Sequence, residues 1–166
     1  MKKLLFAITL LYAGLTSAQL NINTTDAKVE FDYISEKTKG TLSDVTATVK
    51  INPSDLSKSE VSGKAPVKTL DTKNGMRNKH LMSKEYFNVE QYAYMTFKST
   101  SITLVEGVYK AKGKLKIKDI EKDVTFTLKE EEGDHISLTA YIYAEDFGIA
   151  IKQGRDKSKV KVKVIL

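Results

Sequence analysis

Hydrophobic and polar residues alternate along most of the chain with a period of two. The alternation is clearest over residues 109–117, where odd positions carry apolar or small side chains and even positions carry lysine. Successive side chains of a β-strand point to opposite faces of a sheet, so this pattern predicts a strand with one buried and one solvated face. An all-β fold class follows, with one exception near the centre of the chain.

The alternation predicts eight such strands. They are expected at residues 27–35, 45–51, 61–67, 95–104, 109–117, 124–128, 136–142 and 160–164. Lys39-Gly40 is expected to turn the chain into the second strand, and Glu106-Gly107 to form a hairpin. Pro66 falls on the opposite parity from the apolar residues of the third strand, which predicts an exposed or edge position. Eight one-sided strands joined mainly by short turns favour an antiparallel sheet that closes into a barrel, because closure removes its edges.

The exception is the segment 67–100, which breaks the alternation and carries the densest group of aromatic side chains. Asn74 is a suitable N-cap and predicts a short helix from Gly75 to about Ser83. A second helical turn is expected over residues 89–92. The sequence thus predicts a short helical insert between the third and fourth strands.

The first eighteen residues have the features of a secretory signal peptide. Lys2-Lys3 precedes an apolar run from Leu4 to Leu15, and the small residues that follow, ending at Ala18, suit a signal peptidase. We expect cleavage after Ala18, which leaves residues 19–166 as a single barrel domain. The apolar run is too short for a spanning helix, which needs about 20 apolar residues, so no transmembrane segment is expected in the mature chain. The predicted location is exported, in the periplasm or secreted.

The charge pattern argues against nucleic-acid binding. The formal net charge is +6, but the lysines are spread in alternation, as at Lys159, Lys161 and Lys163. Alternating lysines mark the solvent face of a strand, where they also discourage edge pairing. A nucleic-acid site would gather arginines beside aromatic residues. We therefore expect no nucleic-acid partner.

An eight-stranded barrel can hold either a packed core or one small ligand. The chain has no tryptophan, and small residues occupy inward positions at Ala47, Gly63, Ala65, Ala111, Gly113 and Ala140. If these residues leave a cavity, Phe in place of Ala111 or Gly113 would displace ligand from a folded barrel. Alternatively, the glycines serve bulges and strand bending while Phe31, Phe97 and Phe126 fill the centre. The pattern alone leaves both interpretations open.

Arg77 and His80 are the residues most suited to a polar contact. They lie three residues apart, so a helix would place them on one face, where they could meet a polar or anionic ligand head at the barrel mouth. Alternatively, Arg77 braces the insert through backbone carbonyls or Glu85, with His80 satisfied beneath it.

Catalytic and metal chemistry have little support in the sequence. The two histidines, His80 and His135, are not in metal-ligand spacing, and the chain has no cysteine. No nucleophile elbow or phosphate-binding loop occurs. We predict neither an enzyme nor a cofactor-dependent protein.

Three groups of residues form a specific pattern. The central group is Leu70-Asp71-Thr72, Asn74, Arg77, His80-Leu81, Ser83, Tyr86-Phe87, Tyr92 and Phe97-Lys98-Ser99. The other groups are residues 52–56, upstream, and residues 113–117, 124–126 and 146–149, downstream. Together they span essentially all of the chain after residue 18 and resemble the YceI-like family of exported lipid-binding proteins. The chain departs from the family pattern at Ala93, where proline is usual, and in the unusually charged segment 152–157.

The resemblance implies a lipocalin-like antiparallel barrel that holds a long-chain amphiphile of polyisoprenoid, quinone or fatty-acyl type for sequestration or transport. From strand parity and this resemblance, the expected ligand-binding residues of the barrel wall are Phe31, Tyr33, Phe97, Ala111, Leu115, Phe126, Leu138 and Ile142, with Arg77 and His80 near the mouth. The alternative is a ligand-free exported barrel that acts as a stress-protective or protein-interaction module. Either version is compatible with a homodimer.

Overall fold

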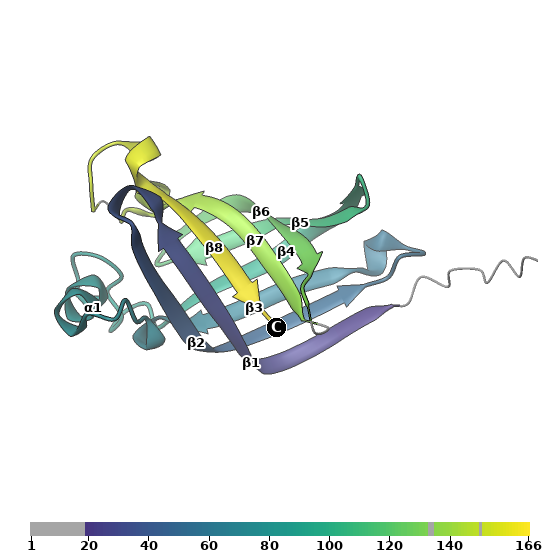
Figure 1. The fold of residues 1–166 in the computed structure, drawn as a ribbon, viewed down its shortest axis with the longest axis horizontal. Helices are drawn as coiled ribbons and strands as arrows, with labels where there is room; N and C mark the ends of the chain where they lie inside the picture. Colours follow the sequence, from purple (N-terminus) through teal and green to yellow (C-terminus); the bar gives the residue numbers. More distant parts are fainter. Residues whose placement is uncertain (1–18, 133–134, 150) are drawn as a thin grey trace, which may run out of the picture.

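The computed structural model describes residues 19–132, 135–149 and 151–166, so the predicted signal peptide lies outside the described residues. Within these ranges the chain forms a closed barrel of eight antiparallel strands, in which each strand pairs with the next and β8 pairs with β1 (Figure 1). The strands are β1 Leu20–Tyr33, β2 Thr38–Ile51, β3 Glu60–Pro66, β4 Tyr94–Val105, β5 Val108–Ile117, β6 Ile120–Glu130, β7 Ile136–Tyr143 and β8 Lys159–Ile165. The predicted fold class is confirmed.

β1 begins at Leu20, earlier than the alternation predicted. Its pairing with β2 shifts register between Thr24 and Ala27 and again between Ala27 and Val29. Such bulges insert extra residues and change which parity points inward. Leu20 and Ile22 therefore face the core from even positions, while Ala27 and Val29 do so from odd positions. The strand thus has inward residues of even parity before the bulges and of odd parity after them, and only the odd-parity part was predicted from the sequence.

The turn predicted at Lys39-Gly40 is wrong. The chain turns earlier, through the 3-10 helix Ile34–Glu36 and Lys37, whose φ is 50°. Gly40 lies inside β2 opposite Phe31, and a Cβ there would overlap the Phe31 ring and lie 2.8 Å from the carbonyl oxygen of Asp71. Gly40 therefore serves a close approach between segments and not a turn.

The exposed position predicted for Pro66 is also wrong. Pro66 is buried and is the last residue of β3, paired with Tyr94. The chain then enters a 3-10 turn at Val67–Thr69, and the N–H of Val67 donates to the carbonyl of Ala93 at 2.9 Å. Proline is tolerated here because the ladder ends at this residue, so its missing N–H costs no strand pairing.

The insert contains the one α-helix of the described residues, α1, over Gly75–Met82. As predicted, Asn74 caps it: its Oδ1 accepts from the N–H of Arg77 at 3.0 Å. The expected second helical turn is reduced to a hydrogen-bonded turn, in which Tyr92 N–H donates to Asn88 O at 2.9 Å. None of the helices in the described part of the chain has the length and apolarity required to cross a membrane.

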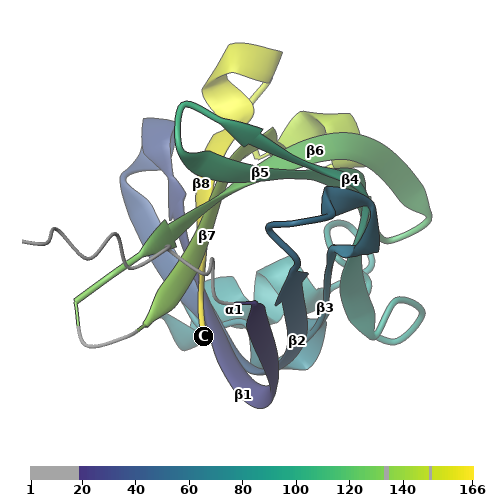
Figure 2. The same ribbon diagram turned by 90° about the vertical axis from the view of Figure 1, so that its right-hand side faces the viewer.

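The barrel has two ends of different construction, which we call the insert half and the distal half. The insert half carries α1 and the β1–β2 turn, while the distal half carries the β2–β3 and β4–β5 turns (Figures 1 and 2). The distal half is filled by a cluster of buried residues that includes Ile51, Ile102, Ala111, Val124 and Ala140. Leu20, Ile22, Leu56 and Leu166 pack against this cluster. The distal end is therefore closed by side chains.

Candidate ligand-binding site

A cavity of about 380 Å³ occupies the insert half of the barrel. Its wall is almost entirely apolar and takes side chains from all eight strands and from the insert. The lining includes Val29, Phe31, Leu42, Val45, Met95, Leu115, Ile117, Ile142, Val160, Val162 and Val164, together with Leu70, Leu81, Tyr86 and Phe87. A concave, largely preformed apolar pocket of this size is typical of a small-molecule site.

The small inward residues divide between the two halves. Ala47, Gly63 and Ala65, on the paired strands β2 and β3, line the cavity and give it width. Ala111 and Ala140 belong instead to the packed cluster of the distal half. The cavity interpretation therefore applies to the small residues of β2 and β3, whereas Ala111 and Ala140 are packed; Phe31, Phe97 and Phe126 line the cavity and do not fill it.

Gly113 also belongs to the distal half, where it serves a bulge. β4 shifts register against β5 between Ser99 and Ser101, beside Gly113. A Cβ on Gly113 would overlap the carbonyl oxygen of Lys98 and lie 2.6 Å from the Cα of Ser99. The expectation that Phe at this position would leave a folded barrel is therefore wrong, because the obstruction is backbone that cannot move aside.

Two phenylalanines form the centre of the cavity floor. Phe97 and Phe126 meet edge to face, with ring centroids 4.9 Å apart and an interplanar angle of 73°. Both line the cavity and both belong to the distal cluster, as do Val49, Val61 and Leu138. Edge-to-face aromatic pairs add about 0.5–1.5 kcal/mol beyond the area they bury, so this floor is a stable boundary between the two halves.

The cavity opens at the insert end. Four of its lining residues there are solvent-exposed: Glu36, Arg77, His80 and Ile151. Three of these four side chains are polar, whereas the floor is made of apolar residues. The site is therefore an apolar chamber with a polar rim.

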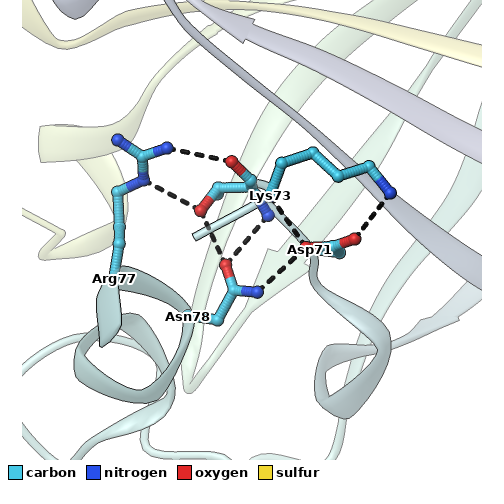
Figure 3. A network of polar contacts seen from close by, with 5 residues as sticks. Asp71, Lys73, Arg77 and Asn78 are labelled. Atoms are coloured by element: carbon cyan, nitrogen blue, oxygen red, sulfur yellow. Dashed lines mark hydrogen bonds and ion pairs between the residues drawn. The ribbon is translucent and has the colours of Figure 1, made fainter. Parts of the chain in front are cut away.

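Arg77 stands on the α1 side of this rim and braces the insert (Figure 3). Its Nε donates to Thr72 Oγ1 at 2.8 Å and its Nη2 to the Thr72 carbonyl at 2.9 Å. Thr72 is only 3% exposed and also donates its hydroxyl to Asn78 Oδ1 at 2.6 Å. The bracing interpretation of Arg77 is thus correct: as expected it binds a backbone carbonyl, that of Thr72, while Glu85 contacts His80 instead. A guanidinium has five N–H donors, so Arg77 keeps further donors while lining the cavity.

Asp71 extends the same network to the barrel wall (Figure 3). It accepts from Lys73 Nζ and from the Lys73 N–H, both at 2.8 Å, and from Asn78 Nδ2 at 3.0 Å. These bonds, with Lys73 foremost, lower the pKa of Asp71 to about 2. Its backbone pairs with Thr41 of β2 through two hydrogen bonds of 2.9 Å. The segment before α1 is therefore fixed to the barrel by both main chain and side chain.

His80 lies at the surface and not beneath Arg77. Its Nε2 is 3.2 Å from Glu85 Oε2, and its ring meets that of Tyr86 edge-on at 4.9 Å. Tyr86 in turn lines the cavity. His80 therefore holds the end of the insert against the mouth while its own ring contacts solvent.

The opposite side of the rim is a loop between β7 and β8. Arg155 donates from Nε and Nη2 to the two carboxylate oxygens of Asp146, each at 2.8 Å, and lies over the ring of Tyr143. This pair lowers the pKa of Asp146. Lys152 forms an ion pair with Glu36 of the β1–β2 turn. The unusually charged segment of the sequence thus closes the loop on itself and ties it to the neighbouring turn.

Of the ten residues predicted as the ligand site, nine line the cavity. They are Phe31, Tyr33, Arg77, His80, Phe97, Leu115, Phe126, Leu138 and Ile142. Ala111 does not, because it lies beyond the floor and is fully buried in the distal cluster. Strand parity identified inward side chains but could not tell at which height the cavity ends.

The apolar residues that the insert contributes to the cavity wall were not predicted. Leu70, Leu81 and Phe87 close the side next to β2. Leu81 and Phe87 stand in the segment that resembled a known family, so that segment was the available signal. Among the described residues no three His, Asp or Glu side chains gather as a metal site would require. What this arrangement offers a ligand is burial of apolar surface.

The closed antiparallel barrel and the apolar chamber at one of its ends define a lipocalin-like architecture. Comparison with known proteins agrees: the model of the YceI-like domain matches residues 20–166. The chain belongs to the YceI-like family.

Individual relatives are distant. A UPF0312 protein from Photorhabdus laumondii is 31% identical over 85 residues, which cover 51% of this chain and 44% of the relative. BcnA of Burkholderia cenocepacia superposes with a TM-score of 0.70 at 22% identity, over 84% of this chain and 93% of that one. A polyisoprenoid-binding domain from Saccharophagus degradans superposes with a TM-score of 0.56 at 11% identity, over 87% and 94%. These structures establish the shared fold.

Proposed function

We propose that this protein binds the apolar chain of a long amphiphile, of polyisoprenoid, quinone or fatty-acyl type, in the cavity of the insert half. The observation that carries the proposal is the contrast within one barrel: the distal half is packed, whereas the insert half keeps about 380 Å³ of apolar space. Cavities that serve no ligand lower stability, so natural cores contain few of them. A neighbour of the same fold described as a polyisoprenoid-binding domain supports the same ligand class.

The apolar wall supplies the affinity. Each buried methylene contributes about 0.8 kcal/mol, so ten methylenes would offer about 8 kcal/mol before the entropic costs of binding. No strong polar contact is needed for a useful dissociation constant. The walls select for an extended apolar chain and discriminate little between prenyl and acyl types.

The polar head of the ligand would remain at the mouth, beside the lining side chains of Arg77 and His80. Both are already engaged, Arg77 with Thr72 and His80 with Glu85. We infer that these two residues shape the mouth first and contact a head group second. Together with the signal peptide expected over residues 1–18, this gives an exported protein that sequesters or transports its ligand.

The test is native mass spectrometry of the protein purified without detergent, followed by organic extraction and identification of the lipid. We expect one prenyl or acyl species per chain, released by extraction. Protein that is emptied and then offered prenyl and fatty-acyl probes should take up one molecule again.

The matched control is a cavity-filling variant. Ala47 lines the cavity on β2, and Ala47→Phe places a ring in the space the ligand would occupy. It should fold and carry no lipid. A wild-type protein that is empty and takes up no probe would refute the proposal and favour a protein-interaction module.

A further inference from the structure

We infer that the hydroxyl of Tyr33 is the polar contact of the ligand, and that it receives an uncharged oxygen, such as the hydroxyl of a prenyl alcohol or the carbonyl of a quinone. This inference rests on the proposed function and names the head group that the same site accepts. Its basis is that one buried polar side chain of the cavity lining has no hydrogen-bond partner among the described residues.

Most polar groups of the rim are already paired. Arg77 donates to Thr72, and Glu36 forms an ion pair with Lys152. His80 faces Glu85, and its side chain is 60% exposed. Arg77 and His80 are exposed, so water can satisfy their remaining donors, and none of these groups needs a ligand.

Tyr33 is different. It is the last residue of β1, lines the cavity and is only 5% exposed. Its Oη is buried and has no hydrogen-bond partner among the described residues. Buried tyrosine hydroxyls nearly always find a partner, so an unpaired one in a cavity wall indicates a group that the ligand supplies.

The surroundings of Tyr33 keep its hydroxyl neutral. Burial raises the pKa of Tyr33, and the carboxylate of Glu36 raises it further; Lys152 lowers it, and Glu145 raises it by less than Lys152 lowers it. The phenol therefore stays protonated and can both donate and accept.

The same carboxylates select against an anionic head. A phosphate or carboxylate beside Tyr33 would meet the negative charges of Glu36 and Glu145 in a partly desolvated site, where repulsion is stronger than in water. Lys152 forms an ion pair with Glu36 and offsets that charge, whereas Glu145 is not part of this ion pair. An uncharged oxygen gains the hydrogen bond without the repulsion.

The test compares three probes that share a branched chain: geranylgeraniol, geranylgeranyl phosphate and the hydrocarbon phytane. Their affinities are measured by competition for the emptied protein without detergent. Tyr33→Phe removes the hydroxyl and keeps the ring. Tyr141→Phe is the matched control, because Tyr141 is 53% exposed and does not line the cavity.

We expect Tyr33→Phe to lower the affinity for geranylgeraniol about fivefold, the effect of losing one neutral hydrogen bond, and to leave the affinity for phytane unchanged. Without ligand, the Tm of Tyr33→Phe should equal or exceed that of the wild type, because an unpaired buried group has been removed. Glu36→Gln should raise the affinity for geranylgeranyl phosphate relative to the affinity for geranylgeraniol, because a negative charge near the head group has been removed. Tyr141→Phe should change none of these quantities.

Equal affinity of wild type and Tyr33→Phe for geranylgeraniol would overturn the inference while leaving the proposed function intact. So would tighter binding of the phosphate than of the alcohol by the wild type. A lower Tm of ligand-free Tyr33→Phe would show that the hydroxyl has a protein partner, and would also overturn it. Failure of the wild type to bind any of the three probes would refute the proposed function itself.

Discussion

The insert half and the distal half of this barrel are built from the same strands and the same alternation, yet one holds a cavity and the other a packed core. In the distal half Ala111 is fully buried among Phe126, Ile102 and their neighbours. In the insert half Ala47 has an equally small side chain and is also buried, but it lines the cavity. Residue size therefore does not decide between cavity and core; what decides is how closely the opposite wall and the chain ends approach.

The distal half is filled because several segments converge there. The first part of β1 enters beside β2, and Leu56 and Leu166 pack from the 3-10 helix Leu56–Lys58 and the end of the chain. At the insert end the corresponding segments are α1 and its flanking turns. They lie at the side of the mouth and do not fill it. Changing one residue in each half separates these two situations.

The largest expected contrast is between Ala111→Phe and Ala47→Phe. Ala111 is 0% exposed, so a ring there must displace packed neighbours and should cost about 3 kcal/mol of unfolding free energy. Ala47→Phe should change stability by less than about 1.5 kcal/mol and abolish lipid retention. Urea unfolding and native mass spectrometry measure the two effects. Equal destabilisation by both variants would show that the insert half is as tightly packed as the distal half.

A second pair of variants compares glycines. In Gly113→Ala the new Cβ would overlap backbone of residues 98 and 99, so we expect a loss of about 2 kcal/mol. In Gly63→Ala the nearest atom is the carbonyl oxygen of Thr46 at 3.5 Å, an ordinary contact. That variant should be neutral or more stable by up to about 1 kcal/mol, because alanine restricts the unfolded chain. If urea unfolding gave the reverse order, the bulge beside Gly113 would be misassigned.

The smallest expected effect is the loss, in acid, of the stability that Asp71 contributes beside the mouth. The folded-state pKa of Asp71, about 2, lies below its ordinary value of 3.8, so its contribution to stability is present above about pH 4 and is lost as pH falls through 2. Asp71→Asn should therefore lower stability at pH 7, and its difference from the wild type should shrink between pH 4 and pH 2.

The control for the acid experiment is Asp123→Asn. Asp123 forms an exposed ion pair with Lys114 across β5 and β6, away from the insert. Urea midpoints at each pH compare the two variants. A pH dependence of the Asp123→Asn difference as large as that of Asp71→Asn would mean that general charge, and not the network at the mouth, governs the response.

The sequence predicted the architecture well because alternation reports directly on the two faces of a strand. All eight strands were found in this way, and the break in the alternation located the insert. The helix cap at Asn74 and the Glu106-Gly107 turn were instead predicted from residue type. Two errors have different causes. The turn at Lys39-Gly40 was inferred from residue type, whereas Gly40 lies where two segments approach closely. Pro66 was assigned by strand parity, which stops applying where the ladder ends.

The site was predicted less completely, because parity gives direction but not height along the barrel. Phe97 and Leu138 were identified correctly as inward residues, and so was Ala111, but only the structure shows that Ala111 lies below the floor. A backbone carbonyl was predicted as a partner of Arg77, but not which one. The bond to the Thr72 carbonyl depends on the exact turn of the chain before α1, which no periodicity encodes.

The closed distal end has a consequence for exchange kinetics. If an amphiphile lies in this chamber with its head at the mouth, it would enter tail first and leave head first by the same path. Dissociation must then expose the whole apolar chain in sequence, so residence time should lengthen with every added carbon unit. A donor and an acceptor of such a ligand would have to address the same end of the barrel in turn, never both at once.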